Sequence, residues 1–463
     1  MDKLLNDLVA VVGPENVLLG DDVSQRSVDW FTGAPCRAKA IVRPRNTEQL
    51  SKVMALCYQA DQLVVTHGGM TGIVHGGEAS PEELVVSLEL MNQIEEVDLV
   101  GSTIQVQAGV TLQRVQEAAA EIDMQFPLDL GARGSCTIGG NIATNAGGIR
   151  VIRYGMMRQQ VLGLEAVLSD GTVVSSLNKM LKNNAGYDLK QLFIGSEGTL
   201  GIVTRAVLRL QPHMPSEQTA LVAVSSFDAL TQLLRRLSQQ LANSLSAFEA
   251  LWNSHYRLVT TESGKHAPPL ADDSPFYAII ETLGLDDAQD AEHFSEILQK
   301  AMEDGLITDA VLASSGAQRQ GIWAIREDIE VLVHQLKPMF SYDISLPIPH
   351  MDAYVDTLEQ NLKEQWPQTG KMIVFGHLGD GNLHIMITVR DDSPQSRRQV
   401  EQLVYSPLKE YGGSISAEHG IGLEKRDYLS ISRSSEEIAL MKRMKVALDP
   451  KLLLNRGKVV AVE

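Results

Sequence analysis

The chain has 463 residues, of which 44% are hydrophobic and 21% are charged. These values are typical of a globular protein, and the length favours two compact lobes. A formal net charge of −18 argues against nucleic acid and anionic membrane surfaces as partners. An anionic substrate would therefore need a local basic patch.

The N-terminus has no secretory signal pattern, and no stretch approaches the roughly 18 apolar residues of a membrane-spanning helix. The three cysteines, Cys36, Cys57 and Cys136, are widely spaced and odd in number. This pattern predicts neither a disulfide framework nor a cysteine zinc site, and it is typical of a reducing compartment. We therefore expect a cytoplasmic protein with no transmembrane segment.

The first part of the chain predicts one amphipathic helix followed by short strands and glycine turns. Within residues 47–60, Leu50, Val53 and Cys57 fall on one helical face, and Asn46 is the expected N-cap. The pattern beyond this helix favours an α+β lobe that is rich in hairpins. Strands are expected at residues 63–65, 85–88, 94–97, 104–106, 161–168 and 172–175, the last two as one hairpin.

A lobe boundary is expected near Pro212 and Pro215, which interrupt the pattern. Beyond it we expect an antiparallel sheet covered by helices. The final residues 418–463 are too short for a domain and are expected to pack back on the first lobe. In the second lobe, strands at residues 221–224, 277–281 and 310–313 alternate with helices at residues 228–242 and 287–304.

Three glycine-rich clusters, at residues 68–72, 131–148 and 195–201, lie in the first lobe. None has the spacing of a Rossmann or P-loop motif. Glycines let backbone N–H groups approach a pyrophosphate closely, although a single cluster is more often a set of turns. Three clusters in one lobe favour a phosphate-binding site. Neutral donors among them are Thr71, Ser135, Thr144 and Asn145.

A histidine hairpin is predicted where residues 373–375 and 383–389 flank an Asp-Gly turn. His377 follows the first strand and His384 begins the second, so both imidazoles can converge at the hairpin tip. With Glu418, which must arrive from elsewhere in the chain, they make the two-His, one-carboxylate set of a catalytic zinc site. The alternative is that these are ordinary loop histidines.

Residues 127–148, PLDLGARGSCTIGGNIATNAGG, and 195–202, GSEGTLGI, resemble the vanillyl-alcohol-oxidase-type FAD fold. With the histidine hairpin and Glu418-His419, the resemblance narrows to the FAD-dependent D-2-hydroxy acid dehydrogenases, the D-2-hydroxyglutarate and D-lactate dehydrogenase group. It spans nearly the whole chain. The fold it implies is α+β, with a two-subdomain FAD-binding lobe (PCMH type), a cap of antiparallel sheet and helices, and a C-terminal segment that packs back on the FAD lobe. The expected parts are an N-terminal helical segment (1–33), the FAD-binding domain (34–215), the cap or substrate domain (216–410) and a segment that completes the active site (411–463).

The resemblance implies that His377, His384 and Glu418 hold a divalent metal, usually zinc, and that His419 is the catalytic acid or base beside it. The metal would polarise the C2 hydroxyl of the substrate, His419 would take its proton, and hydride would pass to the flavin. Arg326 resembles the cap arginine that meets a substrate carboxylate.

The alternative for Arg326 is a surface ion pair with Glu327 or Glu330. Besides Arg326 and His419, the residues expected to bind substrate are Ser341, Tyr342 and Asn382.

FAD is expected to bind noncovalently, because Met70 stands where covalently flavinylated relatives have His. The expected FAD contacts are His67, Gly68, Gly69, Met70, Thr71, Gly72, Pro127, Asp129, Gly134, Ser135, Gly139, Gly140, Asn141, Thr144, Asn145, Gly147, Glu197, Gly198, Gly201, Ile202 and Asn455.

Three departures concern the substrate. Hydroxyglutarate-oxidising members carry a Lys, a Thr and an Asn where this chain has Ser341, Glu330 and Met386. A distal carboxylate would lose those donors and would meet Glu330, which puts the familiar pose of a dicarboxylate in doubt. Lactate-type members are closer at Ser341, whereas the FAD motifs are closer to the hydroxyglutarate branch.

The leading hypothesis is a dehydrogenase of a small anionic D-2-hydroxy acid that passes electrons to an electron-transfer flavoprotein or a quinone. One alternative is an oxidase that uses O₂. Another is a non-catalytic flavin-binding redox protein, which would not need the metal set. The sequence leaves the assembly open, with a homodimer as one option.

Overall fold

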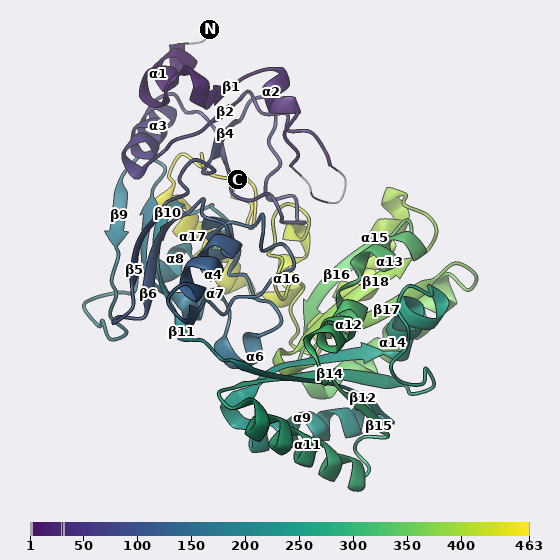
Figure 1. Cartoon of the computed structure of the whole chain (residues 1–463). Helices are drawn as coiled ribbons and strands as arrows, with labels where there is room; N and C mark the ends of the chain where they lie inside the picture. The colour runs from purple at the N-terminus through teal and green to yellow at the C-terminus, as the bar shows by residue number, and fades with distance from the viewer. Residues whose placement is uncertain (1–2, 29, 31–32, 463) are drawn as a thin grey trace. The chain divides into compact units, whose positions relative to one another are not determined.

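The computed structural model describes residues 3–28, 30 and 33–462 (Figure 1). The chain forms two compact units. Unit 1 comprises Met1–Gly148, Gly155–His213 and Glu418–Glu463, and unit 2 comprises Ile149–Tyr154 and Met214–Ala417. The second expected boundary, after residue 410, falls later, because Ser414 forms a β-bridge with Ser345 and so ties this stretch to unit 2.

The first sheet of unit 1 has the order β1-β2-β4-β3, and β4 pairs in parallel with both β2 and β3. The predicted helix forms as α3, and the side chain of Asn46 accepts a hydrogen bond from Gln49 N at its start. The elements here are α1 (Lys3–Val12), β1 (Val17–Leu18), α2 (Asp21–Ser24), β2 (Ala40–Val42), α3 (Thr47–Gln59), β3 (Val64–His67) and β4 (Leu84–Ser87).

The second sheet of unit 1 is antiparallel, in the order β5-β6-β10-β8-β9. The predicted hairpin across Asp170-Gly171 is confirmed as β8 and β9. The elements are β5 (Ile94–Asp98), β6 (Thr103–Gln107), α4 (Leu112–Ala120), β7 (Met124–Gln125), α5 (Ile138–Thr144), α7 (Met157–Gln160), β8 (Val161–Val167), β9 (Val173–Ser176), α8 (Lys190–Phe193), β10 (Ile202–Arg209) and β11 (Gln211–Pro212).

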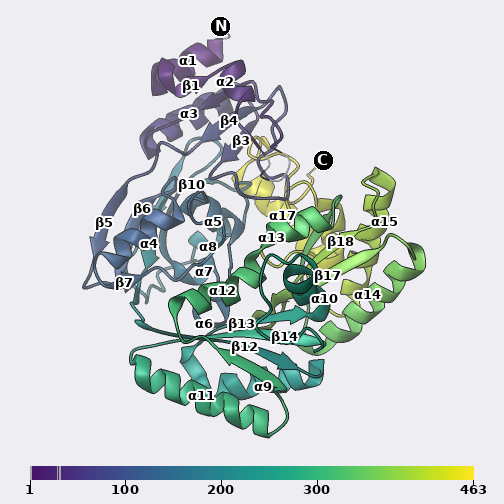
Figure 2. The same cartoon turned by 45° about the vertical axis from the view of Figure 1, so that its right-hand side comes forward.

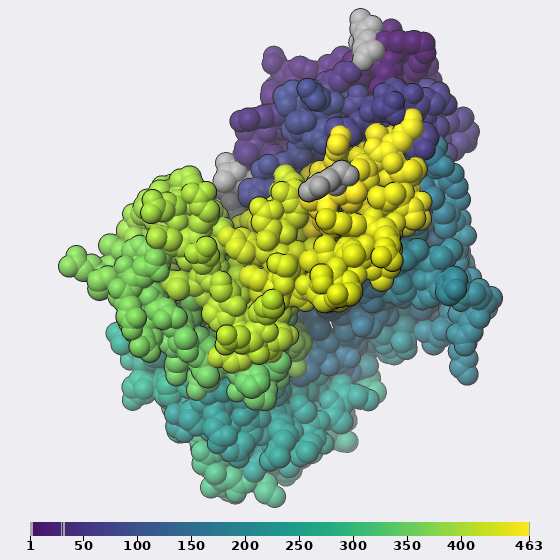
Figure 3. All heavy atoms as spheres, turned by 180° about the vertical axis from the view of Figure 1, so that it is seen from behind, coloured from purple at the N-terminus to yellow at the C-terminus, as the bar shows by residue number. Residues whose placement is uncertain are grey.

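The C-terminal segment returns to unit 1, as expected. Leu454 forms a parallel β-bridge with Val64 of β3, and its side chain is fully buried in the main core of the unit. In Figure 3 this segment, in yellow, lies on the surface of unit 1. Its helices are α16 (Leu429–Ser432) and α17 (Ser435–Leu448), and α17 begins with a capping box from Ser434 and Glu437.

Unit 2 is built on a seven-stranded sheet in the order β15-β12-β14-β13-β17-β18-β16, in which every pair is antiparallel. The expected helix-covered antiparallel sheet is confirmed, with α9 and α11 on one face and α10 and α12 on the other (Figure 2). The strands are β12 (Ser216–Val224), β13 (Leu245–Trp252), β14 (Phe276–Gly284), β15 (Asp309–Leu312), β16 (Phe340–Ser345), β17 (Lys371–His377) and β18 (Asn382–Thr388).

The helices of unit 2 include the excursion 149–154, which interrupts unit 1 in sequence and contributes α6 next to β13. None of the described helices of the chain is long and apolar enough to cross a membrane. The helices are α6 (Val151–Tyr154), α9 (Phe227–Leu241), α10 (Asn253–Arg257), α11 (Asp287–Glu303), α12 (Gly316–Glu327), α13 (Ile329–Gln335), α14 (Met351–Gln365) and α15 (Pro394–Tyr405).

Candidate functional site

The two hairpin histidines meet at the end of β17 and β18 in unit 2. His377 is the last residue of β17 and His384 the third of β18, and a short 3₁₀ turn joins the strands. Both side chains are buried, and their Nε2 atoms lie 3.4 Å apart. The sequence therefore predicted correctly that one hairpin brings these imidazoles together.

A buried carboxylate stands behind each imidazole. His377 Nδ1 donates to Glu249 Oε1 over 2.5 Å, and His384 Nδ1 lies 3.8 Å from Asp343 Oδ1. Glu249 comes from β13, where it pairs in register with His377, and Asp343 comes from β16, opposite His384. Because the other nitrogen of His377 carries the proton, its Nε2 presents a lone pair toward His384.

The separation of the two Nε2 atoms fits a shared metal ion. Two ligands of a tetrahedral zinc at about 2.0–2.1 Å are ~3.3–3.4 Å apart, and the Nε2 atoms of His377 and His384 lie at 3.4 Å. A carboxylate behind a ligating imidazole is the usual outer partner, because it fixes the tautomer that points the lone pair at the metal. The chemistry and spacing of this pair therefore suit zinc or a similar cation.

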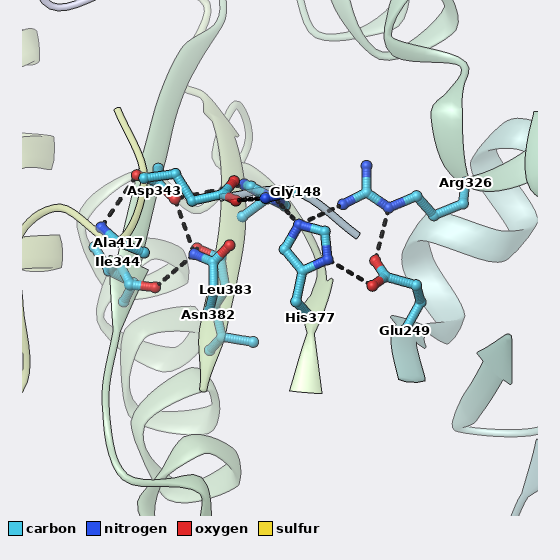
Figure 4. Close-up of polar contacts among 11 residues, drawn as sticks. Gly148, Glu249, Arg326, Asp343, Ile344, His377, Asn382, Leu383 and Ala417 are labelled. Atoms are coloured by element: carbon cyan, nitrogen blue, oxygen red, sulfur yellow. Dashed lines mark hydrogen bonds and ion pairs between the residues drawn. The ribbon is translucent and has the colours of Figure 1, made fainter. Parts of the chain in front are cut away.

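Arg326 lies beside His377. It is in the last turn of α12 and is 9% exposed. Its Nε donates to Glu249 Oε2 over 2.9 Å, and its Nη2 lies 3.3 Å from His377 Nε2 (Figure 4). Burial alone would raise the pKa of Glu249, but His377 and Arg326 outweigh it and lower that pKa to about 2. Glu249 is therefore a permanent anion between two donors.

The expected alternative for Arg326, a surface ion pair with Glu327 or Glu330, is wrong, because Arg326 is buried and pairs with Glu249. The side chain of Glu330 is 85% exposed and pairs with Lys265 at 3.0 Å. The expectation that Glu330 would repel a distal carboxylate is therefore also wrong. The residue lies in the first turn of α13, with its side chain exposed to solvent.

Ser341, Met386 and Tyr342 separate onto two faces of the sheet. Ser341 pairs in register with Met386, two residues from the pair of Asp343 and His384, so both side chains share the face of His384. Tyr342 alternates to the opposite face, where its ring packs edge-on against Tyr405 with centroids 5.5 Å apart. The expectation that Tyr342 binds substrate stays a prediction, with this side chain placed on the face opposite His384.

Asp343 is fully buried and lies beside His384, the other histidine of the pair. Its Oδ1 accepts from Asn382 Nδ2 over 2.8 Å, and its Oδ2 accepts from Ala417 N over 3.1 Å (Figure 4). The amide group of Asn382, expected to bind substrate, thus donates to Asp343. Ala417 is covalently followed by Glu418, whose Cα lies about 3.8 Å from that of Ala417.

Unit 1 holds the next part of this segment. Glu418 Oε1 accepts from Gly148 N over 2.6 Å. Three residues on, Ile421 N and Gly422 N donate to the two carboxylate oxygens of Glu197 over 2.7 and 2.8 Å. Burial raises the pKa of Glu197 in spite of these donors. Glu197, expected to contact FAD, therefore uses its carboxylate to hold the loop that carries Glu418 and His419.

The three glycine clusters of unit 1 meet one another. A Cβ at Gly69 would lie 2.2 Å from Ser135 O, so the first cluster packs directly on the second. Glu197 N donates to Ala143 O over 2.8 Å, which joins the third cluster to the second. Asn455 completes the group, because it accepts from Thr66 N and donates to Glu197 O.

Two further observations bear on the fit of a ligand to these clusters. Thr66 Oγ1 is buried and has no hydrogen-bond partner among the described residues. A Cβ at Gly72 would meet nothing within 4 Å, so this glycine leaves backbone open rather than packed. Both suit a ligand with oxygen acceptors that approaches the backbone closely. His67, by contrast, is buried with its Nε2 2.7 Å from Gly77 O, and burial lowers its pKa to about 4.

Sequence reasoning missed Glu249 and Asp343. Glu249 is the single charged residue of the run LSAFEALW at residues 245–252. A lone carboxylate in a buried strand must have a partner, so this was the available signal. The strand β13 itself was not predicted, and its partners across the sheet are far away in sequence.

Comparison with known families covers most of the chain. Residues 38–176 match the family described as FAD binding domain, and residues 214–459 match FAD linked oxidases, C-terminal domain. The first of these matches lies within unit 1 except for residues 149–154, which belong to unit 2.

Individual proteins match over nearly the full length. The chain is 38% identical to the mitochondrial D-2-hydroxyglutarate dehydrogenase of Bos taurus, over 98% of this chain and 83% of that protein. It is 40% identical to the D-2-hydroxyglutarate dehydrogenase of Xanthomonas citri pv. viticola, over 95% and 92%. The structure of p-cresol methylhydroxylase superposes with a TM-score of 0.79 over 99% of this chain and 96% of that one, at 15% identity. This structural likeness shows the fold.

Proposed function

Because the chain belongs to the FAD-dependent D-2-hydroxy acid dehydrogenase family, we propose that it oxidises a D-2-hydroxy acid to the 2-oxo acid with a divalent metal as well as FAD. His377, His384 and Glu418 are proposed as the metal ligands. The observation that carries the metal is the pair of Nε2 atoms 3.4 Å apart with a carboxylate behind each ring. A metal ion can take the place of whichever proton these two nitrogens would otherwise share, since a neutral imidazole offers its free nitrogen as a ligand.

Covalent continuity supports Glu418 as the third ligand. Asp343 pairs with His384 across the sheet and also binds Ala417 N. Glu418 follows Ala417 by one peptide bond. Its backbone therefore starts next to a residue that is hydrogen-bonded to Asp343, the strand partner of His384. A Glu side chain adds further reach.

FAD would supply a two-electron hydride acceptor and the metal a Lewis acid, when each is bound. The proposed tasks of the chain itself are to bind, orient and deprotonate. The Nη groups of Arg326 would bind the substrate carboxylate, since its Nε is already committed to Glu249. His419, adjacent to the ligand Glu418, would take the C2 hydroxyl proton while C2 gives up hydride.

FAD is proposed to rest on the three glycine clusters of unit 1. The family match supports an FAD-binding domain over residues 38–176. The open backbone at Gly72 and the buried hydroxyl of Thr66 support the contacts proposed for the first cluster. Met70 supports noncovalent attachment, because it lacks a nucleophilic nitrogen.

The test is anaerobic reduction of the bound flavin by a panel of D- and L-2-hydroxy acids. Bleaching by D-enantiomers is expected, with two electrons passing from the acid to each flavin, and chelation should abolish it while FAD stays bound. No bleaching by any acid would refute the proposal. Equal bleaching by metal-free protein would refute the metal.

The electron acceptor is proposed to be an electron-transfer flavoprotein or a quinone. Rapid reoxidation of the reduced flavin by O₂ would favour the oxidase alternative. The expected cytoplasmic location stays a prediction, since the relative from Bos taurus is named as mitochondrial.

A further inference from the structure

The further inference concerns Glu249. This carboxylate is fully buried in the middle of β13, in a run that is otherwise apolar or uncharged. Each of its oxygens has a separate partner: Oε1 accepts from His377 Nδ1, and Oε2 accepts from Arg326 Nε. Figure 4 shows the carboxylate between the ring and the guanidinium.

The first consequence is for His377. The distance to Oε1 is 2.5 Å, which is short for a hydrogen bond from nitrogen, and a charged acceptor shortens such a bond. It fixes the proton on Nδ1 and the ring orientation, so that Nε2 faces His384. Outer carboxylates of this kind make a ligating imidazole more basic, and their removal typically weakens metal binding about 10–100-fold.

The second consequence is for Arg326. Its Nε is held by Oε2, and its guanidinium carbon stacks 5.0 Å from the centre of the Phe375 ring. These two restraints leave the guanidinium little freedom, so its Nη groups keep one direction. Nη2 lies 3.3 Å from His377 Nε2, which places the anchor for a carboxylate next to the ligand nitrogen.

We propose that Glu249 is a positioning residue that sets the metal-ligating nitrogen of His377 and the substrate-binding face of Arg326 at once. One carboxylate then fixes the distance between the bound metal and the carboxylate of a 2-hydroxy acid, whose C1 and C2 oxygens are themselves neighbours. The inference rests on the proposed function, because it takes His377 as a ligand and Arg326 as the substrate anchor.

A purely structural ion pair is the competing explanation, and the same sheet offers a matched control. Glu281 of β14 is also buried, at 1% exposure, and also pairs with an arginine, Arg150, at 3.1 Å. Its other partners are the hydroxyl of Ser246 and the carboxyl of Glu217 rather than an imidazole. Glu281→Gln therefore removes an equally buried charge from an arginine pair without touching the histidines.

The experiment compares Glu249→Gln with Glu281→Gln in the flavin-loaded full chain. The amide can accept from only one of the two donors, because its nitrogen carries protons of its own. Zinc affinity, measured by competition with a chromophoric chelator and without substrate, should fall about 10–100-fold in Glu249→Gln. In zinc-saturated Glu249→Gln, the dissociation constant of the 2-hydroxy acid should rise about tenfold or more. This constant comes from the dependence of the flavin reduction rate on the concentration of the acid. Glu281→Gln should match wild type in both measurements.

Arg326→Lys separates the two effects. It keeps the positive charge but loses the planar guanidinium that can donate two parallel hydrogen bonds to a carboxylate. The affinity for the 2-hydroxy acid should therefore fall while the affinity for zinc stays close to that of wild type. If Glu249→Gln does not fold, Glu249→Asp carries the same comparison, since the shorter side chain keeps the charge but cannot reach both partners.

If wild type binds zinc and oxidises the acid while Glu249→Gln equals Glu281→Gln in both measurements, the inference is wrong and the proposed function stands. If wild type neither binds zinc nor loses activity on chelation, the metal dependence in the proposed function is refuted.

Discussion

His255 predicts an acid-sensitive unit 2. This side chain, in α10, is fully buried, with its ring centre 4.6 Å from that of Phe375, and neither ring nitrogen has a hydrogen-bond partner among the described residues. Burial, and then the positive charge of Arg326, lowers its pKa to about 3. The folded protein therefore keeps this imidazole neutral, whereas the unfolded chain protonates it near pH 6.5.

The sign follows from proton binding. Between pH 6.5 and pH 3 the unfolded state binds more protons at His255 than the folded state, so the free energy of unfolding falls as pH falls. With a folded pKa of about 3, the loss reaches about 2 kcal/mol at pH 5 and is close to zero at pH 8. Glu249, whose folded pKa of about 2 is below that of the free side chain, also loses stabilising free energy as the pH falls, but mainly below pH 5, and this loss is common to wild type and a His255 variant.

The assay is urea unfolding at pH 8 and pH 5, followed by tryptophan fluorescence. Three of the four tryptophans, Trp252, Trp323 and Trp366, belong to unit 2, so the signal reports mainly on that unit. His255→Phe keeps an aromatic ring against Phe375. Any packing change cancels when the two pH values are compared within one variant.

The stability lost between pH 8 and pH 5 should be about 2 kcal/mol smaller in His255→Phe than in wild type. His350→Phe, which changes an exposed imidazole beside Tyr411, is the control and should follow wild type. If His255→Phe and wild type lose the same stability, the imidazole is protonated or hydrogen-bonded in the fold, and the reasoning is refuted.

Three further predictions concern the cofactors and substrate. Acid precipitation should release about one FAD per chain, because Met70 offers no covalent link; flavin that stays in the pellet would contradict this. His384→Ala should bind FAD but behave like chelated protein, since a zinc site that loses one of three ligands binds weakly; full activity would refute the ligand set. Ser341→Lys should improve flavin reduction by D-2-hydroxyglutarate by roughly one to two decades, the equivalent of about 1.5–3 kcal/mol, relative to D-lactate. If wild type already prefers D-2-hydroxyglutarate by orders of magnitude and the Lys variant gains nothing, another residue binds the distal carboxylate.

Local patterns predicted the elements whose signals are local. The cap of Asn46 and the periodicity behind it mark α3, and the Asp-Gly turn marks β8 and β9. The parallel pairing of β2 and β3 with β4 could not be predicted this way. Parallel partners are joined by long crossovers, so nothing within a short window distinguishes them from hairpin strands.

The site residues likewise divide into those placed by local pairing and those placed by strand pairs that are distant in sequence. His377 and His384 were predictable because seven residues and one turn separate them, and the hairpin alone brings them together. Glu249 reaches His377 only through the pairing of β13 with β17, across 128 residues. The position of Glu330 was predicted wrongly because a spacing of four residues from Arg326 places the two side chains side by side on one helix face. The chain instead ends α12 at Glu327 and caps a new helix with Asp328, which turns Glu330 to solvent.

With Glu330 exposed to solvent, the choice between a dicarboxylate and a monocarboxylate substrate depends on Ser341 and Met386. Both lie on the His384 face, directly opposite one another on β16 and β18. Ser341 is half-buried and Met386 is buried, so the wall they form is apolar with one hydroxyl. A distal carboxylate against this wall would lose its hydrogen bonds to water and gain at most one from a neutral donor. The free energy lost on desolvation then exceeds the free energy gained from that hydrogen bond. An apolar or short side chain loses nothing there. Removing the expected repulsion by Glu330 thus weakens the case against a dicarboxylate but does not reverse it, and the Ser341→Lys comparison measures the part that remains.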